Sequence, residues 1–441
     1  MRYIIVGNST AGINCAETIK SIDRQGEITI LTHEKYHLYS RCLLTHYLAD
    51  TLSYDRLFIK DKQWYNKLSI KPLFGKTVTK LNATKKQICL DSGETIGFDK
   101  LLIASGGHPI CLNLPCADAN GIFTLRTLED AKRIKRFCQQ YRVKSAAILG
   151  AGFVGLKTAV ALTKQNIKTT IIEKLNCLMP RMMDDTGSAI LQKHFVDNKI
   201  NVKLATEANS FTLNKKGLVN GINLRNGKNI PTQMVIISVG VRPNIEFIKG
   251  SGIKTKHGII TDDYLQTNIK DIFAAGDVAE TTDLITGQKT INALWSAAST
   301  QGRIAGVNMT GQTKRYPGSL PMNSVELFGL PIISFGYVCP IIRNDPKKTL
   351  QTRLRREGKD YQVIKRKNTR PQTYQKLVFK NNRLVGAIFI GQEQIKHAGV
   401  FLALLKSKEI IAEPKKNLFT NPWRYSDKLL GSIPQSLMQY A

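Results

Sequence analysis

Hydrophobic and polar positions repeat one arrangement at two places in the chain. Residues 2–12 (RYIIVGNSTAG) and 145–155 (SAAILGAGFVG) each join a short apolar run to a glycine-rich turn. A run with helical spacing follows each turn, and a second apolar run comes at 27–34 (EITILTHE) and at 168–174 (KTTIIEK). Short β-branched runs favour strands, and apolar residues at helical spacing favour helices. The pattern therefore predicts strand–turn–helix–strand twice, and an α/β fold.

The last third of the chain has a different pattern. In residues 374–391 (YQKLVFKNNRLVGAIFIG), two apolar runs flank KNNR, which predicts a β-hairpin with KNNR as its turn. After about residue 410 the pattern fades, and this tail is a candidate arm on a partner subunit. No run approaches the roughly 18 apolar residues of a membrane helix, and residues 1–7 resemble a strand rather than a signal peptide. We therefore expect a cytoplasmic protein.

The second glycine-rich turn has the full spacing of a dinucleotide fingerprint. Gly150 allows the tight turn, Gly152 lets the backbone approach a pyrophosphate, and Gly155 lets the helix lie close to the strand. The helix N-terminus then offers free N–H groups to the phosphates. Glu173, at the end of the next apolar run, can accept a hydrogen bond from a ribose 2′-hydroxyl, and its charge repels a 2′-phosphate. These residues predict an NAD site that favours NADH over NADPH, although Lys174 adjoins the carboxylate.

The first turn departs from this spacing at one position. It reads GNSTAG, with Gly7 and Gly12 in place and Ser9 where the middle glycine is expected. Serine is small, and its hydroxyl can donate a hydrogen bond to a phosphate. Glu34 is the candidate ribose ligand here, 27 residues after Gly7 (34 − 7 = 27), a longer interval than usual. Two such turns in strand–helix–strand context indicate two dinucleotide sites rather than two ordinary turns.

Five further segments follow in a distinctive order. They are 98–109 (FDKLLIASGGHP), 121–131 (GIFTLRTLEDA), 235–244 (VIISVGVRPN), 267–280 (TNIKDIFAAGDVAE) and 291–311 (INALWSAASTQGRIAGVNMTG). With the two turns, this order resembles the FAD-dependent pyridine-nucleotide oxidoreductases of the glutathione-reductase fold. Residues 316–336 (YPGSLPMNSVELFGLPIISFG) are similar to the branch that holds NADH:rubredoxin reductases and the flavin part of the nitrite reductase large subunit.

The resemblance implies two Rossmann-like dinucleotide-binding domains and a C-terminal α/β interface domain. The FAD domain would comprise residues 1–112 and 243–325, and the NAD(P) domain, residues 113–242, would be inserted into it. Residues 326–441 would form the interface domain, interrupted by a basic insert at 343–370. The implied reaction moves a hydride from NADH to FAD and passes the electrons to an acceptor. A homodimer is a further expectation.

The resemblance also assigns residues to FAD. Ala104, Ser105 and Gly106 would line a strand end beside it, and Asp277 in AAGDVA would bind its ribityl and pyrophosphate portion. Asp277 follows an apolar run and precedes a helix-like segment, so neighbouring N–H groups can face an anion. Arg41 would pair with an FAD phosphate, or is an ordinary surface arginine.

Three other positions concern the two cofactors. Trp295 would pack near the isoalloxazine, or is a core or interface tryptophan. Gly240 would contribute to the NAD site. Lys157 stands where many members have a glutamate that reaches toward the nicotinamide and flavin, so that role is not carried over.

Cys42 separates two classes of acceptor. In coenzyme A disulfide reductases and in NADH peroxidases or oxidases, a single redox cysteine lies near the start of the helix after the second strand of the FAD domain. A helix N-terminus and the neighbouring Arg41 would lower the pKa of the Cys42 thiol. Many electron-transfer relatives have proline there, and the cysteine would then be a small buried side chain. Cys111 and Cys116 have C-x4-C spacing but follow GGHP, the wrong place for the redox pair of glutathione reductase.

The composition restricts the classes of metal, protein and nucleic-acid partner that the chain would bind. The eight cysteines contain no C-x-x-C, so neither a metal site nor an iron–sulfur cluster is expected. With 64 Lys and Arg against 33 Asp and Glu, the formal net charge is +31, which attracts anionic partners. Rubredoxins and ferredoxins are strongly acidic and fit as acceptors. Nucleic acid does not fit well, because aromatic and basic residues are not interleaved. A basic face that is simply solvated is the alternative.

Three functions therefore compete. The first is an NADH-dependent FAD reductase that passes electrons to a rubredoxin or ferredoxin. The second is a Cys42-dependent NADH reductase or oxidase that acts on coenzyme A disulfide, a persulfide, peroxide or O2. The third is a flavin subunit or sensor without turnover of its own, suggested by Lys157 and the basic insert.

Overall fold

The chain divides into two compact units in a computed structural model that describes residues 1–339, 361–369, 372–411 and 415–421. The first unit comprises residues 1–110, 125–135 and 240–320, and the second comprises residues 111–124, 136–239 and 321–441. Each unit contains a five-stranded parallel sheet. The α/β class predicted from the two strand–turn–helix–strand repeats is therefore confirmed.

The parallel sheet of the first unit has its earliest strand in the middle. In spatial order the strands are β19 (Ile272–Ala274), β7 (Lys100–Ile103), β1 (Arg2–Val6), β2 (Glu27–Thr32) and β3 (Ile70–Phe74). All of β1 after Arg2 is buried, as a central parallel strand covered on both faces requires. This order brings the end of β19 beside the end of β7, where Ala274 is opposite Ile103.

Smaller elements surround this sheet. Antiparallel strands β4 (Val78–Asn82), β5 (Gln87–Leu90) and β6 (Thr95–Gly97) form one group. A second group consists of β18 (Ile259–Ile260), β20 (Ala279–Thr282) and β21 (Lys289–Thr290), and a third pairs β8 (Gly107–Pro109) with β17 (Val241–Pro243). Short helices are α2 (Leu44–Leu48), α3 (Lys62–Lys67) and the 3-10 turns η1 (Arg41–Leu43), η2 (Asp55–Leu57) and η3 (Glu246–Ile248).

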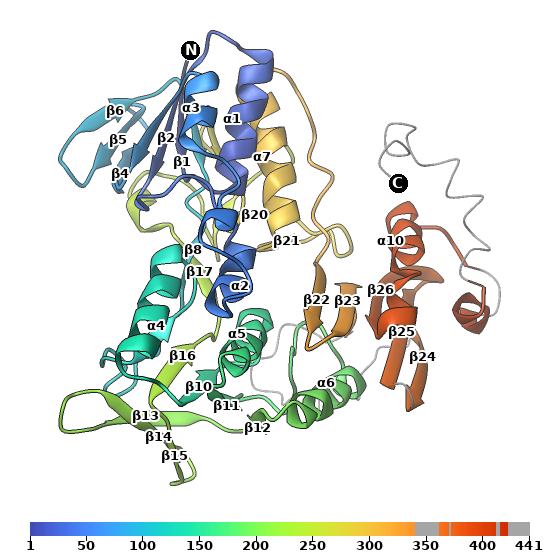
Figure 1. The fold of residues 1–441 in the computed structure, drawn as a ribbon. Helices are drawn as coiled ribbons and strands as arrows, with labels where there is room; N and C mark the ends of the chain where they lie inside the picture. The colour runs from blue at the N-terminus through green and yellow to red at the C-terminus, as the bar shows by residue number, and fades with distance from the viewer. Residues whose placement is uncertain (340–360, 370–371, 412–414, 422–441) are drawn as a thin grey trace. The chain divides into compact units, whose positions relative to one another are not determined.

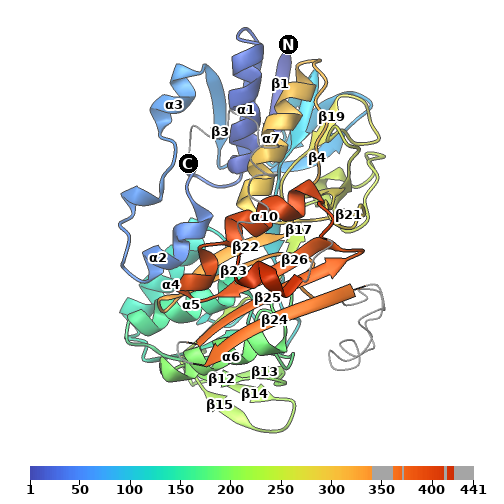
Figure 2. The same cartoon turned by 90° about the vertical axis from the view of Figure 1, so that its right-hand side faces the viewer.

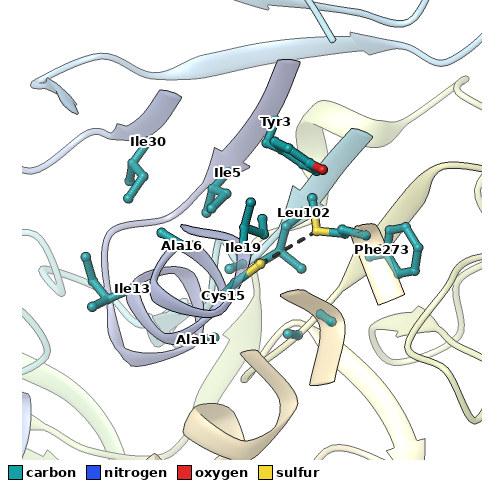
Figure 3. Packing of buried hydrophobic residues seen from close by; sticks show 14 of the residues in the cluster. Tyr3, Ile5, Ala11, Ile13, Cys15, Ala16, Ile19, Ile30, Leu102 and Phe273 are labelled. Atoms are coloured by element: carbon teal, nitrogen blue, oxygen red, sulfur yellow. Dashed lines mark hydrogen bonds between the residues drawn. The ribbon is translucent and has the colours of Figure 1, made fainter. Parts of the chain in front are cut away.

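Helices α1 (Thr10–Ile22) and α7 (Trp295–Met309) lie side by side in this unit (Figures 1 and 2). Two glycines of α7 allow the close approach. A Cβ on Gly302 would lie 2.2 Å from the carbonyl oxygen of Ala11, and one on Gly306 would lie 2.8 Å from that of Cys15. Cys15 is fully buried with its Sγ 3.6 Å from Met309 Sδ (Figure 3). Burial raises the pKa of this thiol, so Cys15 is a packing residue.

The second unit contains the other parallel sheet. In spatial order its strands are β12 (Asn201–Lys203), β11 (Lys168–Ile172), β10 (Ser145–Leu149), β16 (Met234–Ile237) and β9 (Ile122–Thr124). Its helices are α5 (Phe153–Lys164) and α6 (Asp185–Asp197), and α4 (Leu128–Gln140) begins in the first unit. An antiparallel group is formed by β13 (Ala208–Leu213), β14 (Val219–Leu224) and β15 (Asn229–Pro231). Strand β10, the second predicted repeat, again lies in the middle of its sheet.

An antiparallel sheet completes the second unit (Figure 2). Its order is β22 (Met322–Leu327), β23 (Leu330–Gly336), β26 (Arg383–Ile390), β25 (Gln372–Lys380) and β24 (Tyr361–Thr369). Helix α10 (Ala398–Ser407) packs on β26, and α9 (Gln392–Ile395) precedes it. The predicted hairpin is confirmed, with Asn381 and Asn382 in the left-handed conformation that such turns need. The boundary expected between 325 and 326 falls within β22.

Only residues 361–369 of the expected basic insert at 343–370 lie among the described residues. These form β24, the edge strand that pairs with β25. Their exposed cations Lys365, Arg366 and Lys367 suit an edge strand, because edge charges discourage pairing with other chains. Residues 343–360 and 370 lie outside the described residues. In the tail, 415–419 form the turn η4 (Lys415–Phe419), whose last carbonyl accepts a hydrogen bond from Arg366 of the same chain at 3.3 Å.

Candidate functional site

The first glycine-rich turn joins β1 to α1 through two close backbone contacts. Gly7 has φ +127°, and a Cβ there would lie 2.0 Å from the carbonyl oxygen of Ala104 at the end of β7. A Cβ on Gly12 would lie 1.9 Å from the carbonyl oxygen of Gly7. Real side chains never approach backbone oxygens so closely, so both positions need glycine. The predicted tight turn and close helix–strand packing are thereby present.

Ser9 is the N-cap residue of α1, in an extended conformation, and its side chain makes no capping hydrogen bond. The hydroxyl oxygen is therefore not used to cap the helix, and the hydroxyl can donate to an acceptor at the point where the helix presents its N–H groups. An anion is the natural occupant of such a position, because the N–H groups and the helix dipole both favour negative charge.

The second turn repeats this construction in the second unit. Gly150 has φ +104°, and a Cβ there would lie 2.4 Å from the carbonyl oxygen of Ser238 at the end of β16. A Cβ on Gly155 would lie 2.2 Å from the carbonyl oxygen of Gly150. Gly152, the N-cap of α5, would meet nothing within 4 Å. The middle position thus borders open space, which is what close approach of a pyrophosphate requires.

Glu173 immediately follows β11, where a ribose ligand is expected. Glu173 is 8% exposed, and its two carboxylate oxygens accept hydrogen bonds from Ala151 N at 2.7 Å and Leu175 N at 2.8 Å. The carboxylate is therefore fixed at the rim of the second turn and keeps lone pairs for a hydroxyl donor. Lys174 points its charge elsewhere, because its Nζ pairs with Glu207 at 2.9 Å.

Glu34 and Arg41 form an ion pair in the first unit. Tyr39, which the sequence interpretation did not identify, connects this pair to α4. Its hydroxyl donates to Glu34 at 2.6 Å and accepts from Leu128 N at 2.9 Å. Burial acts to lower the pKa of Arg41, but Tyr39 and Glu34 outweigh it and the pKa is raised. Arg41 is therefore a fixed cation beside the candidate ribose ligand, and not a surface side chain without a partner.

Asp277 lies in the turn after β19 and forms an ion pair with Arg126 at 2.7 Å, with both side chains partly buried. Arg126 is another residue that the sequence interpretation missed. It also lies near Gly106, where a Cβ would be 3.8 Å from Arg126 Nη2. The helix-like segment expected after Asp277 is instead the strand β20, since buried Ala279 and Glu280 pair with β18. The turn nevertheless places a carboxylate and a guanidinium together.

Ser105 is tied to the chain segment that returns from the second unit. Its hydroxyl donates to the carbonyl oxygen of Asn244 at 2.8 Å, and Asn244 Nδ2 donates to the Ser105 carbonyl at 2.9 Å. Asn244 N also bonds to the Gly106 carbonyl at 2.9 Å. These reciprocal bonds shape the strand end that Ala104, Ser105 and Gly106 were expected to provide.

Comparison with known protein families identifies the family to which the chain belongs. Residues 1–302 match the family described as pyridine nucleotide-disulphide oxidoreductase, and residues 321–409 match the rubredoxin NAD+ reductase C-terminal domain. The chain belongs to the pyridine nucleotide-disulphide oxidoreductase family. It is accordingly an oxidoreductase whose cofactors are FAD and NAD(P)H.

Individual relatives place it more finely. The assimilatory nitrate reductase electron transfer subunit of Bacillus subtilis is 28% identical over 99% of this chain, which spans 53% of that protein. The NADH-rubredoxin oxidoreductase of Clostridium acetobutylicum is 32% identical over 80% of this chain and 85% of that protein. A solved NAD-dependent persulfide reductase from A. fulgidus has a TM-score of 0.84 at 26% identity, covering 93% of this chain and 77% of that one. The oxidoreductase is thus similar to rubredoxin reductases both in its C-terminal region and over most of its length.

The residues of both turns fit the cofactors of the family. A dinucleotide needs donors and cations for its diphosphate and acceptors for its ribose hydroxyls. The first unit supplies the N-terminus of α1, Ser9, Arg41 and Arg126 as donors, with Glu34 and Asp277 as acceptors. The second unit supplies the N-terminus of α5 and Glu173.

Cys42 is exposed and lies in η1, just before the five-residue α2. The alternative that it is a small buried side chain is therefore wrong for this structure. The expected helix N-terminus is weak, since α2 is too short to carry a substantial dipole. Cys111 and Cys116 are also exposed and form no disulfide. Among the described residues, no group of His, Cys, Asp and Glu could hold a metal ion.

Three remaining candidates have plain structural surroundings. Trp295 begins α7 and packs, partly buried, against the apolar core of the first unit. Gly240 has φ +132°, a conformation that favours glycine, and follows β16. Lys157 Nζ lies over the ring of Phe153, 5.7 Å from its centroid, near the start of α5.

In the part of the chain that the structure describes, no helix is long and apolar enough to cross a membrane.

Proposed function

We propose that the oxidoreductase is an NADH-dependent FAD reductase that passes electrons to a small acidic redox protein of the rubredoxin or ferredoxin type. The observation that carries this proposal is the match of residues 321–409 to the C-terminal domain of rubredoxin reductases. The Clostridium relative, named for rubredoxin, supports it. So does the formal net charge of +31, since a basic enzyme attracts an acidic partner.

FAD would bind to residues 1–112 and 243–325, and NADH to residues 113–242. In the first region, Gly7, Ser9 and Gly12 bring the α1 N-terminus to the FAD diphosphate, and Arg41 and Arg126 supply positive charge. When bound, FAD supplies the chemistry, because it accepts a hydride and releases electrons singly or in pairs. The chain orients the rings, and the hydride step needs no acid or base from a side chain.

NADH would bind with its pyrophosphate at Gly152 and its adenosine ribose at Glu173. The carboxylate is held by two backbone N–H groups, so it cannot easily turn away from a 2′-phosphate. Repulsion between these anions would favour NADH over NADPH. Gly240 would border the same site.

A stopped-flow experiment tests the acceptor. Enzyme reduced by NADH is mixed with a clostridial rubredoxin at ionic strengths from about 0.02 to 0.5 M, where the Debye length falls several-fold. Electrostatic steering predicts a second-order rate constant that falls by at least about tenfold over this range. Ferricyanide is the control acceptor, because it reports flavin reduction without protein docking. Rubredoxin reduction that is slow and independent of salt would contradict the proposal.

A second candidate function follows from the exposure of Cys42. An exposed cysteine beside Arg41 could serve a reductase of disulfides, persulfides, peroxide or O2. The fold similarity to the A. fulgidus persulfide reductase favours testing this alternative. It predicts that Cys42→Ser abolishes turnover while FAD stays bound. Full activity of that variant with every acceptor would end this alternative.

A third possibility, a flavin subunit without turnover of its own, is suggested by the name of the Bacillus relative, an electron transfer subunit. Multiple turnovers of NADH with ferricyanide by the isolated chain would exclude it. Bleaching of the visible flavin absorbance by a single equivalent of NADH, with no further turnover, would favour it.

A further inference from the structure

Gln301 is a buried polar side chain of helix α7. Gln301 is 1% exposed. The next residue, Gly302, lies where α7 closely approaches the backbone of α1. A buried amide must satisfy its donors and its acceptor within the protein. Its partners therefore show what the side chain holds in place.

The oxygen of Gln301 accepts a hydrogen bond of 2.7 Å from Gly276 N, the residue before Asp277. The nitrogen of the same amide donates to Thr281 Oγ1 at 3.2 Å and to the Tyr316 hydroxyl at 3.3 Å. The backbone N–H of Gly276 can only donate, so it fixes the amide with its oxygen toward Gly276 and its nitrogen toward the two hydroxyls.

Gly276 itself packs between the two helices. Its φ is +82°, and a Cβ there would lie 3.3 Å from the Ala11 side chain and 3.6 Å from that of Ala298. The turn that carries Asp277 is thus supported by α1, by α7 and by the Gln301 oxygen. The same helix α1 presents the glycine-rich turn at its N-terminus.

We propose that Gln301 is a positioning residue that fixes the Asp277 turn relative to the N-terminus of α1. This inference rests on the proposed role of both elements in binding FAD. The FAD diphosphate and ribityl chain need the two elements at a set separation, and Gln301 maintains that separation before the cofactor arrives. Preorganisation of this kind strengthens binding because the cofactor need not order the turn.

The test replaces Gln301 by methionine, which has a similar volume but cannot accept the hydrogen bond. In the apoprotein the turn can then relax, and FAD must restore it on binding. An unpaired buried donor costs about 1–3 kcal/mol, so we expect the Kd of FAD to rise about ten- to hundredfold. The full chain is stripped of flavin, and the Kd is measured by quenching of flavin fluorescence.

Two further measurements separate positioning from a general loss of structure. Circular dichroism and the melting temperature of each apoprotein report folding without FAD. Tyr316→Phe is the matched control, since it removes one partner of the Gln301 amide but leaves the bond to Gly276. We expect this control to change the Kd of FAD by less than about threefold.

A conservative variant gives a second readout. Gln301→Glu keeps an oxygen that can accept from Gly276 N and is close in shape to glutamine. We expect this variant to bind FAD more tightly than Gln301→Met does.

The outcomes are distinct. A folded Gln301→Met apoprotein that binds FAD as tightly as the wild type would overturn the inference. So would a folded Gln301→Glu variant that binds FAD no more tightly than Gln301→Met. A wild-type chain that fails to bind FAD would instead overturn the proposed function.

Discussion

Asp184 is the centre of a buried ionic group in the second unit. As the N-cap of α6 it accepts a hydrogen bond from Gly187 N at 3.0 Å, and its other oxygen accepts from the Tyr374 hydroxyl at 2.7 Å. The same oxygen lies 3.1 Å from Lys376 Nζ and 3.2 Å from Lys365 Nζ. Lys365 and Lys376 stand directly opposite each other on β24 and β25, so one carboxylate neutralises two facing cations in part.

The informative perturbation is Asp184→Asn. Asparagine caps a helix as well as aspartate does, so the change removes the charge and leaves the cap. The Lys376 side chain is 2% exposed and would lose its buried counter-ion, whereas that of Lys365 is 46% exposed and can turn to water. Removing one partner of a buried ion pair costs roughly 3–5 kcal/mol. Because the amide oxygen of the asparagine can still accept a hydrogen bond from Lys376, we expect the lower end, about 3 kcal/mol.

Hydrogen exchange followed by mass spectrometry measures the opening free energy of α6 and β25 without assuming that the whole chain unfolds in two states. A double-mutant cycle adds Lys376→Met, which should recover at least about 1.5 kcal/mol by removing the stranded cation. The control is Asp197→Asn, which breaks the exposed pair with Lys193 and should cost less than about 0.5 kcal/mol. If Asp184→Asn costs no more than this control, the reasoning about burial is refuted.

The same group predicts an acid dependence. Burial acts to raise the pKa of Asp184, but Lys376, Tyr374 and Gly187 outweigh it, and the pKa is lowered below the ordinary 3.8. A carboxyl with a lowered folded-state pKa stabilises the fold above its unfolded pKa, and loses that contribution as the pH falls through the folded value. Exchange protection of α6 should therefore decline below about pH 4, and the Asp184→Asn variant should lack this component of the decline.

Three other predictions concern the cofactor sites and the cysteines. Gly152→Ala should raise the KM for NADH with little change in melting temperature, because the added Cβ enters open space. Gly155→Ala should instead lower the melting temperature, because the added Cβ would lie 2.2 Å from the carbonyl oxygen of Gly150. Thermal melts and NADH kinetics distinguish the two variants. Arg126→Met should raise the Kd of FAD about tenfold through loss of positive charge, and flavin titration at two salt concentrations checks the electrostatic origin. At pH 8 a maleimide should label the exposed Cys42 within minutes but spare Cys177 in the folded chain. Cys177 is spared because burial raises the pKa of its thiol to about 12. Equal labelling of the two cysteines would contradict this prediction.

Much of the fold could be predicted from local pattern, because buried parallel strands require continuous apolar runs. The runs that begin with Tyr3 and Ala146 became the central strands of the two sheets. The hairpin at Asn381 and Asn382 followed from turn chemistry. Strand β24 was missed, because its lysines conceal the alternation. One of them, Lys365, reaches a carboxylate that lies far away in the sequence.

The residues of the candidate site also fall into those that the local sequence predicted and those that it did not. The glycines were predictable, because their spacing encodes contacts within a single turn of backbone. Tyr39, Arg126 and Gln301 were not, because each acts on a partner from another part of the chain. Arg126 and Asp277 are 151 residues apart in sequence, and no local pattern signals their pairing. Exposure of Cys42 could not be read from an apolar stretch, because apolar neighbours in sequence do not determine which single side chain faces solvent in the fold.

The sequence by itself determined the two dinucleotide turns, the α/β class and the family, since each depends on residue type at short, fixed spacing. The tertiary structure decided which charges meet. It brought Asp184 to Lys376 and Gly276 to Gln301 because burial makes an unpaired charge or N–H group costly, and the chain must find partners wherever the fold provides them.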